Sequence, residues 1–576
     1  MTDLSRNREV FFIFTLQARN ISKSYGEKQL FTDLTFDIYH NDRIGLVGHN
    51  GAGKTTLANI IYGSLEADTG TVHCKHHIKI GYLKQSIEYM MNDIGSLTGE
   101  FMEKASELGL KKVQTWEKER MNHLSGGEKL KFSLAEVWST HPDILILDEP
   151  TNHLDLYGIN WLVEKLASFH GAVIIISHDR YFLDKTVTKI FDIENSKLTV
   201  YDGNYSTFYE KKKKFQEDQL HHYNIQQHEK KRIESQMSQL QQWAGKAHRT
   251  MRDQEGFKEF HGVKAKKLDK AIKSKMKRLN KELDKNKIDK PLEEMSVRFQ
   301  FEGNKKHGKR LIEAKNLSKS FHSRSVFKSS YFYINHGERI GLVGPNGCGK
   351  TTFLRMLLGD EPITTGDLSK SPSLKIAYLS QDVADLPLFR TVHETLNLND
   401  KNKLLKARTA LANMGIKASK LNQPIHSLSL GERTKVKLTN LLLDEYDLLI
   451  LDEPTNHLDL ASRNQLEQTL SEFPGTILVV SHDYYFLNSV CEKLLVFEEQ
   501  KIKRIEMTIE EYEVKKQQTK KRNKNQSIEE ELLVVNTEIS AILGELSLLT
   551  PESEKYHELD ISFQLLTKRR RELMNR

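Results

Sequence analysis

Cysteine and long hydrophobic runs are both scarce in this sequence, and each absence excludes a class of protein. The 576 residues include only three cysteines, too few for a disulfide framework or a four-cysteine cluster, so we expect a reducing compartment. No stretch approaches the roughly 18 consecutive apolar residues of a membrane-spanning helix. The apolar run at 10–14 is shorter than the core of a secretory signal, and we interpret residues 1–14 as an N-terminal lead-in. The sequence predicts a soluble, cytoplasmic protein of several domains, with no membrane contact.

The two halves of the chain repeat each other. Residues 45–56 (GLVGHNGAGKTT) recur 296 positions later as residues 341–352 (GLVGPNGCGKTT). Residues 145–155 (LILDEPTNHLD) and 177–179 (SHD) recur 304 positions later. Repeats of this length are duplicated domains. We predict a first domain at 15–208, an interdomain linker at 209–297, a second domain at 298–508 and a C-terminal extension at 509–576.

Each repeat contains a phosphate-binding loop of the pattern G-x4-G-K-T, placed between an apolar strand-like run and a helix-like stretch. Backbone N–H groups of such a loop surround phosphate oxygens, and the helix N-terminus adds a positive dipole end. Lys54 and Lys350 are expected to reach the β- and γ-phosphates, and Thr55 and Thr351 to ligate Mg²⁺. The expected nucleotide-binding residues are Gly48, Asn50, Gly51, Gly53, Lys54, Thr55 and Thr56, and in the second repeat Gly344, Asn346, Gly347, Gly349, Lys350, Thr351 and Thr352.

Two acidic residues follow a buried strand-like run in each repeat. Asp148 and Asp452 come at the carboxyl end of the run, where α/β folds place ligand chemistry, and are expected to hold Mg²⁺. The next residues, Glu149 and Glu453, can orient and deprotonate an attacking water. Two acids that merely end a strand are common, but here the whole pattern occurs twice with the same flanks.

The residues 124–128 (LSGGE), which recur as 428–432 (LSLGE), complete a set that resembles the ATP-binding-cassette (ABC) ATPases. The resemblance implies adenine-stacking aromatics, γ-phosphate-sensing glutamines that also face the metal, switch histidines and loops that cross to the partner domain. The matching residues are, in that order, Tyr25 and Phe321, Gln85 and Gln381, His178 and His482, and Asp155 and Asp459. It also implies the fold class: two tandem α/β ABC-type P-loop ATPase domains, joined by a long α-helical hairpin linker and followed by a C-terminal helical hairpin.

The resemblance further implies two ATP sites, each shared between the repeats, and an ATPase that closes on ATP and Mg²⁺ and opens on hydrolysis. The first site would combine the P-loop, Gln85, Asp148, Glu149 and His178 with the second signature, and the second site would combine the corresponding residues with the first signature. The signature residues are Ser125, Gly126 and Gly127, and in the second repeat Ser429 and Gly431. Leu430 departs from the usual glycine and could loosen close backbone approach. Both glutamates are present, so we expect both sites to hydrolyse ATP.

The linker carries the positive charge of the chain. Residues 211–290 hold 23 Lys and Arg against 11 Asp and Glu, a net charge of +12 that leaves −4 elsewhere. This stretch has no proline and keeps its apolar residues at helical spacing, which predicts two helices in an antiparallel hairpin. A tip loop at about 244–262 would join them, and the residues at this end that could contact RNA are Trp243, His248, Arg249, Phe257 and Phe260. Basic residues neutralise phosphates and aromatics stack on bases, although a charged, solvated coiled coil fits the same pattern.

Tandem cassettes joined by a basic linker resemble the ABC-F family, and the linker sequence resembles its antibiotic-resistance branch. That resemblance implies binding to the E site of the bacterial 70S ribosome, with the linker near P-site tRNA and the 23S rRNA of the peptidyl-transferase centre. It also implies relief of inhibition by lincosamides, streptogramin A and pleuromutilins, and a monomer whose two cassettes pair with each other. A housekeeping translation or assembly factor, or the ATPase subunit of an exporter, stays open as an alternative.

The C-terminal extension has apolar residues at strict 4-3 spacing from Ile528 to Leu549, followed by a second seam and the basic run 568–571. This pattern predicts a helical hairpin. The resemblance implies contact with the small ribosomal subunit, whereas a dimerising coiled coil remains the alternative. The tract at 73–77 (HCKHH) alternates with apolar residues as an ordinary strand does, which we prefer to a zinc site.

Overall fold

The computed structural model describes most of the chain. The described residues are 14–75, 77–84, 98–110, 113, 124–152, 154–252, 267, 270–278, 281, 310–322, 324–380, 386–396, 401–416, 418–443, 446–456, 458–546 and 554–574. The contacts divide the chain into two compact units. The first unit comprises residues 1–301, 381–444 and 455–473, and the second comprises 302–380, 445–454 and 474–576. The first unit therefore contains the first repeat and also the α-helical part of the second.

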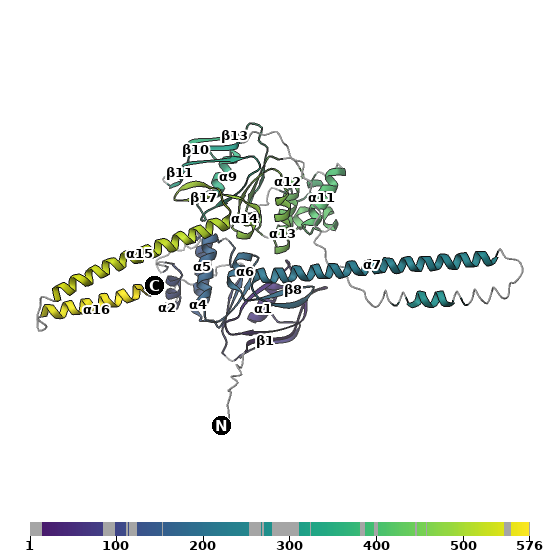
Figure 1. Cartoon of the computed structure of the whole chain (residues 1–576), viewed down its shortest axis with the longest axis horizontal. Coiled ribbons are helices and arrows are strands. Elements are labelled where there is room, and N and C mark those ends of the chain that lie inside the picture. The colour runs from purple at the N-terminus through teal and green to yellow at the C-terminus, as the bar shows by residue number, and fades with distance from the viewer. Residues whose placement is uncertain are drawn as a thin grey trace, which may run out of the picture. The chain divides into compact units, whose positions relative to one another are not determined.

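The first repeat forms two sheets with helices around them (Figure 1). Its elements are β1 (Phe14–Tyr25), β2 (Lys28–Tyr39), β3 (Arg43–Gly48), α1 (Lys54–Tyr62), β4 (Thr69–Cys74), β5 (Ile80–Leu83), α2 (Gly99–Glu107), α4 (Gly126–Ser139), β6 (Ile144–Asp148), α5 (Leu156–Ala167), β7 (Ala172–Ile176), α6 (Arg180–Thr186), β8 (Lys189–Glu194), β9 (Lys197–Asp202) and α7 (Tyr205–Arg252). One sheet has the order β5-β6-β7-β3-β8-β9 and is parallel except for β9; the other, β2-β1-β4, is antiparallel.

The second repeat has the same strand orders, β14-β15-β16-β12-β17-β18 and β11-β10-β13. Its elements are β10 (Arg310–Phe321), β11 (Arg324–Asn335), β12 (Arg339–Val343), α9 (Lys350–Leu358), β13 (Thr365–Lys370), β14 (Ile376–Leu379), α10 (Val392–Thr395), α11 (Lys401–Asn413), the 3₁₀ turns η4 (Ala418–Asn422) and η5 (Ile425–Ser427), α12 (Leu430–Leu442), β15 (Leu448–Asp452), α13 (Leu460–Ser471), β16 (Thr476–Val480), α14 (Tyr484–Val490), β17 (Lys493–Glu498), β18 (Lys501–Ile505), α15 (Ile509–Leu546) and α16 (Glu554–Met574). The helices α10 to α13 belong to the first unit.

The central strands are apolar along their whole length because both faces of the parallel sheet are covered. All residues of β6 and β7 are buried, as are all residues of β15 and β16. Such continuous apolar runs are typical of parallel strands with a layer on each side. The predicted strands at 144–147 and 448–451 are thereby confirmed, and the acids Asp148 and Asp452 end them.

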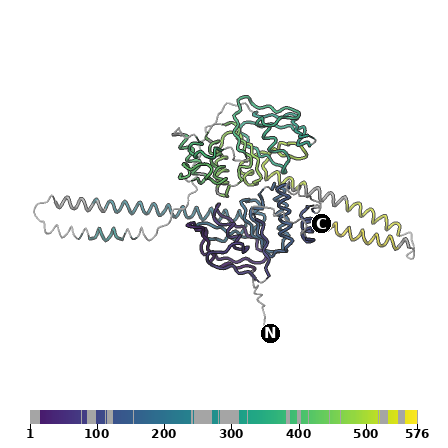
Figure 2. Tube along the Cα trace, turned by 180° about the vertical axis from the view of Figure 1, so that it is seen from behind, coloured from purple at the N-terminus to yellow at the C-terminus, as the bar shows by residue number. Residues whose placement is uncertain are grey.

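The linker begins as one long helix, which extends further than predicted, into the region expected to be the tip loop. Helix α7 runs from Tyr205 to Arg252, so residues 244–252 of the predicted loop are helical. The helix passes through Gly245, which costs a helix interior about 1 kcal/mol relative to alanine, and no proline stops it. Trp243, His248 and Arg249 therefore lie on the helix rather than in a loop. Residues 270–278 are helical as predicted and run alongside α7 in Figures 1 and 2.

The C-terminal residues form the predicted hairpin of α15 and α16 (Figure 1). Val535, Ile539 and Leu573 are buried between the two helices, and Leu532, Phe563 and Leu566 pack against them. These six residues belong to the predicted 4-3 seams, which shows that the periodicity identified the packed face. The tract at 73–77 begins inside β4, which pairs with β1, as expected of an ordinary strand.

Candidate active site

The first P-loop leaves β3 and leads directly into α1. Its last glycine, Gly53, has φ +97° and caps the helix, a left-handed conformation that side chains rarely adopt. A Cβ atom here would also lie 3.0 Å from the Phe31 ring. The ammonium of Lys54 donates to the carbonyl oxygens of Gly48 at 2.8 Å and His49 at 3.2 Å. The loop thus curls around the lysine, which lies where its charge can meet phosphates.

Asp148 ends the neighbouring strand β6 and faces the start of α1. The Thr55 hydroxyl donates to Asp148 Oδ2 at 2.8 Å, and the Tyr82 hydroxyl donates to the same oxygen at 3.4 Å. Burial raises the pKa of Asp148, and the hydrogen bonds from Thr55 and Tyr82 oppose that shift. The structure therefore brings together the two expected metal ligands, Thr55 and Asp148.

Glu149 follows Asp148 in an unusual backbone conformation. Its φ is +50°, in the left-handed region, and its N–H donates to Ile176 O of β7 at 2.8 Å. Strained backbone of this kind costs about 1–3 kcal/mol and occurs often at functional sites. Glu453 in the second repeat has φ +51° and donates to Val480 O at 2.8 Å. The same left-handed conformation at both glutamates indicates that the chain turns sharply after each aspartate. The turn directs the glutamate side chain away from the side chain of the aspartate before it.

The switch histidine lies beside the glutamate in each repeat. His178 Nε2 is 3.6 Å from Glu149 Oε1, and His482 Nε2 is 3.4 Å from Glu453 Oε1. Burial, together with the smaller effect of the charge of Lys54, lowers the pKa of His178 to about 3, so His178 is a neutral imidazole at physiological pH. Burial raises the pKa of Glu149 to about 7. The pair is therefore a neutral donor beside a carboxyl group that titrates near neutrality, which is suitable for a general base.

Residues of helix α13, from the second repeat, act on this first site within the first unit. Asp459 caps α13 by accepting a hydrogen bond from Ser462 N at 2.9 Å. Burial lowers the pKa of Lys54, and the carboxylates of Glu149 and Asp459 oppose that shift. The charge of Arg463 lowers the pKa of Glu149 against the larger effect of burial. The two repeats thus share this site, as expected for the crossing residue Asp459.

The second P-loop repeats the geometry of the first within the second unit. Lys350 donates to the carbonyl oxygens of Gly344 at 2.8 Å and Pro345 at 3.2 Å, and Gly349 caps α9 with φ +104°. Tyr378 donates to Asp452 Oδ2 at 3.4 Å, and burial raises the pKa of Asp452. Burial also raises the pKa of Glu453, to about 8.

The signature serines begin helices in both repeats. Ser125 caps α4 and Ser429 caps α12, each in a reciprocal capping box with a glutamate three residues later. Leu430 is the first residue of α12 and is 44% exposed. The backbone of Leu430 is helical rather than left-handed. A leucine therefore fits the backbone at this position, and its side chain stands at the helix start beside Ser429.

The two expected adenine-stacking aromatics are exposed and are backed by a lysine. Tyr25 is 54% exposed and Phe321 is 42% exposed. The ammonium of Lys23 lies 5.9 Å from the Tyr25 ring centroid, and that of Lys319 lies 4.6 Å from the Phe321 centroid. Each lysine is held by an acid, Asp68 and Glu361 respectively. Both repeats thus present an aromatic ring near the end of their first strand, supported by an ion-paired lysine.

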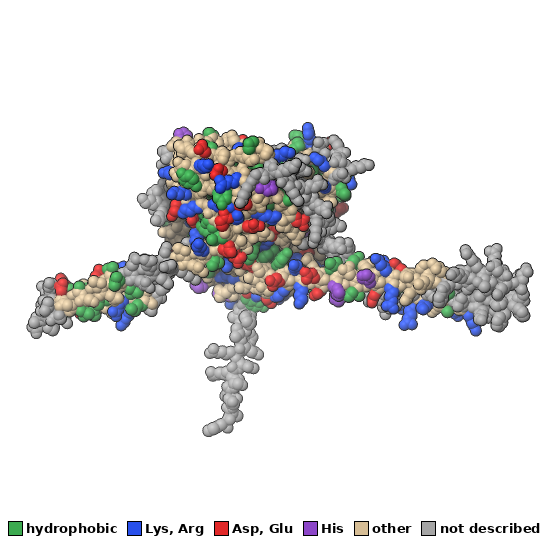
Figure 3. Space-filling model, turned by 45° about the horizontal axis from the view of Figure 1, so that its top comes forward, with side chains coloured by type: hydrophobic (Ala, Val, Ile, Leu, Met, Phe, Trp, Pro, Cys, Tyr) green, Lys and Arg blue, Asp and Glu red, His purple; other side chains and the backbone are tan. Residues whose placement is uncertain are grey.

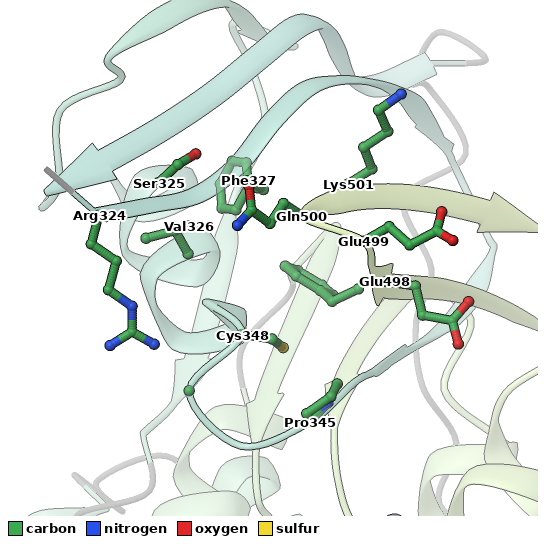
Figure 4. Close-up of a pocket in the computed structure, with 12 residues that line it drawn as sticks. Arg324, Ser325, Val326, Phe327, Pro345, Cys348, Glu498, Glu499, Gln500 and Lys501 are labelled. Carbon is green, nitrogen blue, oxygen red and sulfur yellow. The ribbon is translucent and has the colours of Figure 1, made fainter.

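A cavity of about 520 Å³ adjoins the second P-loop (Figure 4). Its walls are residues 324–327 of β11, Pro345, Gly347 and Cys348 of the P-loop, and residues 497–501 of the β17–β18 hairpin. Figure 4 shows the Cys348 side chain projecting from the P-loop, and its half-buried thiol forms part of the wall. Cys348 thus packs in the wall of this cavity, against the core of the second repeat.

Several predicted site residues lie outside the described residues or have undescribed side chains. Gln85, Gln381, Phe257 and Phe260 are outside the described ranges, and the side chains of Trp243, His248 and Arg249 are not described. Sequence reasoning missed three contributors, the phenols of Tyr82 and Tyr378 and the guanidinium of Arg463. The recurrence of Tyr82 as Tyr378, 296 positions later, was the signal for the phenols, whereas Arg463 stands where the first repeat has Ile159 and had no repeated partner.

Comparison with known proteins identifies the family. A family model described as "ABC transporter" matches residues 31–152 and 327–456, and a second model with that description matches 191–301. The "Ribosome protection protein VmlR" of Bacillus subtilis (strain 168) is 41% identical over 561 residues, which is 96% of this chain and 97% of that protein. The chain belongs to the ABC-F family. This ABC-F protein is an ATPase, and its two cassettes are ABC ATPase domains in tandem.

Other relatives are more distant. The "Energy-dependent translational throttle protein EttA" of Mycobacterium tuberculosis (strain ATCC 25618 / H37Rv) is 28% identical, covering 84% of this chain and 91% of that protein. Among solved structures, an "RNase-L Inhibitor" matches with a TM-score of 0.58 at 21% identity, covering 86% of this chain and 91% of that one. The structural match supports the tandem-cassette fold. Among the described helices, none combines the length and hydrophobicity that crossing a bilayer would need.

Proposed function

We propose that this ABC-F protein is an ATP-dependent ribosome-protection protein. It binds the E site of the bacterial 70S ribosome and uses its interdomain linker to relieve inhibition by lincosamides, streptogramin A or pleuromutilins. The observation that carries the proposal is the 41% identity to a ribosome protection protein over nearly the full length of both chains. The protein acts in the cytoplasm, associated with ribosomes, as a monomer whose two cassettes pair with each other.

The proposed domains follow the repeats: ATPase domains at 15–208 and 298–508, the linker at 209–297 and the C-terminal hairpin at 509–576. The exposed lysines and arginines of α7, among them Lys213, Lys214, Lys231 and Arg232, supply the charge that RNA binding needs. Figure 3 shows basic and histidine side chains along the arm that α7 forms. In the proposal this arm approaches P-site tRNA and 23S rRNA near the peptidyl-transferase centre, and the C-terminal hairpin contacts the small subunit.

The proposed ATP sites use the residues that the P-loops gather. Lys54 and Lys350 with the loop N–H groups hold the phosphates, and the signature serines Ser125 and Ser429 face the γ-phosphate of the opposite site. The donor set fits Mg²⁺: the threonine hydroxyl and the carboxylate oxygen lie 2.8 Å apart, close to the spacing of two neighbouring oxygen ligands on this ion, and phosphate oxygens and water would supply the other ligands. Thr55 and Asp148 would hold it in the first site, and Thr351 and Asp452 in the second, with Gln85 and Gln381 completing each set. Bound Mg²⁺ would neutralise charge on the phosphates.

The proposed catalytic step relies on Glu149 and Glu453. Each carboxylate accepts the proton of the water that attacks the γ-phosphate, which requires the ionised form. The neutral His178 and its counterpart His482 orient the γ-phosphate and the water by donating a hydrogen bond. Because each site is shared between the repeats, loss of the γ-phosphate removes contacts that hold them together. Hydrolysis at both sites therefore opens the protein.

Each of the two proposed adenine-stacking rings should contribute to ATP affinity at its own site, and by a similar amount. Tyr25→Ala and Phe321→Ala should each weaken ATP binding at their own site by about tenfold, because stacking on a base contributes roughly 1–3 kcal/mol. Equilibrium titration with a fluorescent ATP analogue measures this change. Tyr331 in strand β11 is 64% exposed and provides a control, since Tyr331→Ala should leave the affinity for ATP unchanged at both sites. Unchanged affinity in the two test variants would exclude these rings from the nucleotide sites.

The proposed function is tested by expressing the protein in a drug-sensitive bacterium. We expect the inhibitory concentration of at least one lincosamide, streptogramin A or pleuromutilin to rise at least about fourfold, and we expect the Glu149→Gln/Glu453→Gln variant to give no increase. An unchanged inhibitory concentration for all three classes, with the protein present at measurable levels, would contradict the proposal. Intracellular drug concentration should stay constant, whereas lower accumulation would identify an exporter subunit.

A housekeeping role in translation is the second candidate, favoured by the resemblance over 84% of the chain to the translational throttle protein EttA. The two candidates make different predictions on deletion in the source organism. Slower growth or altered polysome profiles, with unchanged drug sensitivity, would select the housekeeping role. Normal growth with increased drug sensitivity would select ribosome protection.

A further inference from the structure

The roots of the two helical arms are copies of one another. Tyr205 and Phe208 at the start of α7 are buried in the first core, and Ile509 and Tyr512 at the start of α15 are buried at positions 304 later. Lys212 pairs with Asp192 at 2.6 Å and Glu194 at 2.8 Å, and its counterpart Lys516 pairs with Glu498 at 2.5 Å. The duplication therefore continues past the predicted domain ends at 208 and 508. Each arm is anchored on its own cassette rather than loosely attached.

Each root is also held by the short helix that follows the switch histidine. In the first repeat, Asp184 of α6 accepts hydrogen bonds from Ser206 N at 2.6 Å and Ser206 Oγ at 2.5 Å. In the second, Asn488 of α14 donates to Glu510 Oε2 at 3.1 Å. These are the same positions in the two repeats with donor and acceptor exchanged. Helix α6 thus joins the region of His178 to the linker helix.

Helix α6 has one further connection, an ion pair whose two residues are not repeated in the other half of the sequence. Arg180, only 8% exposed, donates to Asn464 Oδ1 at 2.9 Å and forms an ion pair with Glu467, both on α13. The Asn464 side-chain amide in turn lies 3.5 Å from the hydroxyl of Tyr209 on α7. The positions equivalent to Arg180 and Glu467 hold Tyr484 and Val163, two residue types that cannot form an ion pair. All four of these contacting residues belong to the first unit.

Helix α13 also reaches the first ATP site, through Asp459 and Arg463 near its start. One helix therefore places two charges that act on the nucleotide site and, further along, the side chains that contact Arg180 and Tyr209. Arg180 in turn stands on the helix that holds the linker. A closely packed helix transmits displacement because it moves as a body. We propose that Arg180 is a positioning residue that couples closure of the first ATP site to the linker helix α7. This inference rests on the proposed function, in which ATP closes the shared sites and the linker acts.

The coupling is tested in the free protein, away from ribosomes and drugs. Spin labels at Glu229→Cys on α7 and Gln468→Cys on α13, both exposed, report the distance between the two helices by pulsed electron paramagnetic resonance. The background carries Cys74→Ser, Cys348→Ala (the residue at the equivalent position 52) and Cys491→Ala, and Glu149→Gln/Glu453→Gln to retain ATP. With Arg180 present, ATP should narrow the distance distribution to one population. With Arg180→Met, the distribution should stay as broad with ATP as without it.

Matched variants separate coupling from folding. Tyr484→Met, at the equivalent position of the second repeat, should leave the ATP-dependent narrowing intact, and the charge exchange Arg180→Glu/Glu467→Arg should restore at least half of it. In the chain with its native glutamates, Arg180→Met should keep ATPase activity within about threefold but lower the increase in inhibitory concentration by about fourfold or more. Narrowing that persists in Arg180→Met, or that is lost equally in Tyr484→Met, would overturn the proposal. Failure of the parent protein to protect cells, with the Arg180-dependent narrowing intact, would overturn the proposed function alone.

Discussion

Replacing both Glu149 and Glu453 by glutamine should reduce ATP hydrolysis at least about a hundredfold while ATP binding is retained. Glutamine preserves the size of the side chain but cannot accept the proton of the attacking water, and loss of a general base costs about 10²–10⁴ in rate. Steady-state phosphate release measures the loss, and retained nucleotide measures binding. The closed protein should then remain on 70S ribosomes in sucrose gradients containing ATP.

The single variants extend this test to the individual sites. Glu149→Gln and Glu453→Gln should each remove hydrolysis at one site, so their residual rates give the share of each site. The exposed Glu136 on α4 serves as a control, since Glu136→Gln should hydrolyse ATP at the original rate. A double variant that turned over ATP normally would show that another group activates the water. A double variant that hydrolysed ATP slowly but did not sediment with ribosomes would support the assignment of the two glutamates. The same result would contradict the proposal that the protein binds ribosomes.

Glu453→Gln should stabilise the nucleotide-free protein at alkaline pH and have little effect at acidic pH. Burial raises the pKa of Glu453 from its usual value to about 8, so the folded protein keeps a proton that the unfolded chain releases above about pH 4.5. Stability therefore falls as pH rises from about 4.5 to about 8, by up to about 5 kcal/mol. Glutamine is neutral throughout and avoids this loss. Thermal unfolding at pH 5 and pH 8.5 should show the variant gaining several degrees over the parent only at pH 8.5.

An exposed glutamate nearby provides the control for this titration. Glu499, in the turn after β17, has a side chain that is 80% exposed, so Glu499→Gln should shift the unfolding midpoint equally at both pH values. An equal gain in unfolding temperature for Glu453→Gln at pH 5 and pH 8.5 would contradict the raised pKa of Glu453, because it would reflect packing rather than charge.

ATPase activity should also rise between pH 6 and 8 as Glu149 and Glu453 ionise.

The parts of the site that the sequence predicted are those in which each function resides in a short, contiguous motif. The P-loop glycine that caps α1, the acid that ends β6 and the serine that caps α4 are each set by neighbouring residues, so their local geometry follows from the motif. The helical seam of α15 and α16 was also predictable, since periodicity alone identifies a packed face. Function beyond the ATPase chemistry came instead from resemblance to a family.

The parts that the sequence did not predict depend on contacts between distant segments. Arg180 and Glu467 are 287 positions apart, and no local pattern pairs them. The left-handed Glu149 likewise donates its N–H across to Ile176 of β7, a contact that no local pattern in the sequence indicates. The end of α7 was placed too early because Gly245 resembles a helix stop, whereas a long helix tolerates one glycine.

The matching roots of α7 and α15 suggest an order of events in the origin of this chain. A single ancestral cassette would already have ended in a projecting helix, seated on its last strands by a lysine. Tandem fusion then gave the two copies of that helix different fates, since the first became the connection to a second cassette, while the second stayed a tail. On this view the projecting helix is older than the joining of the two halves.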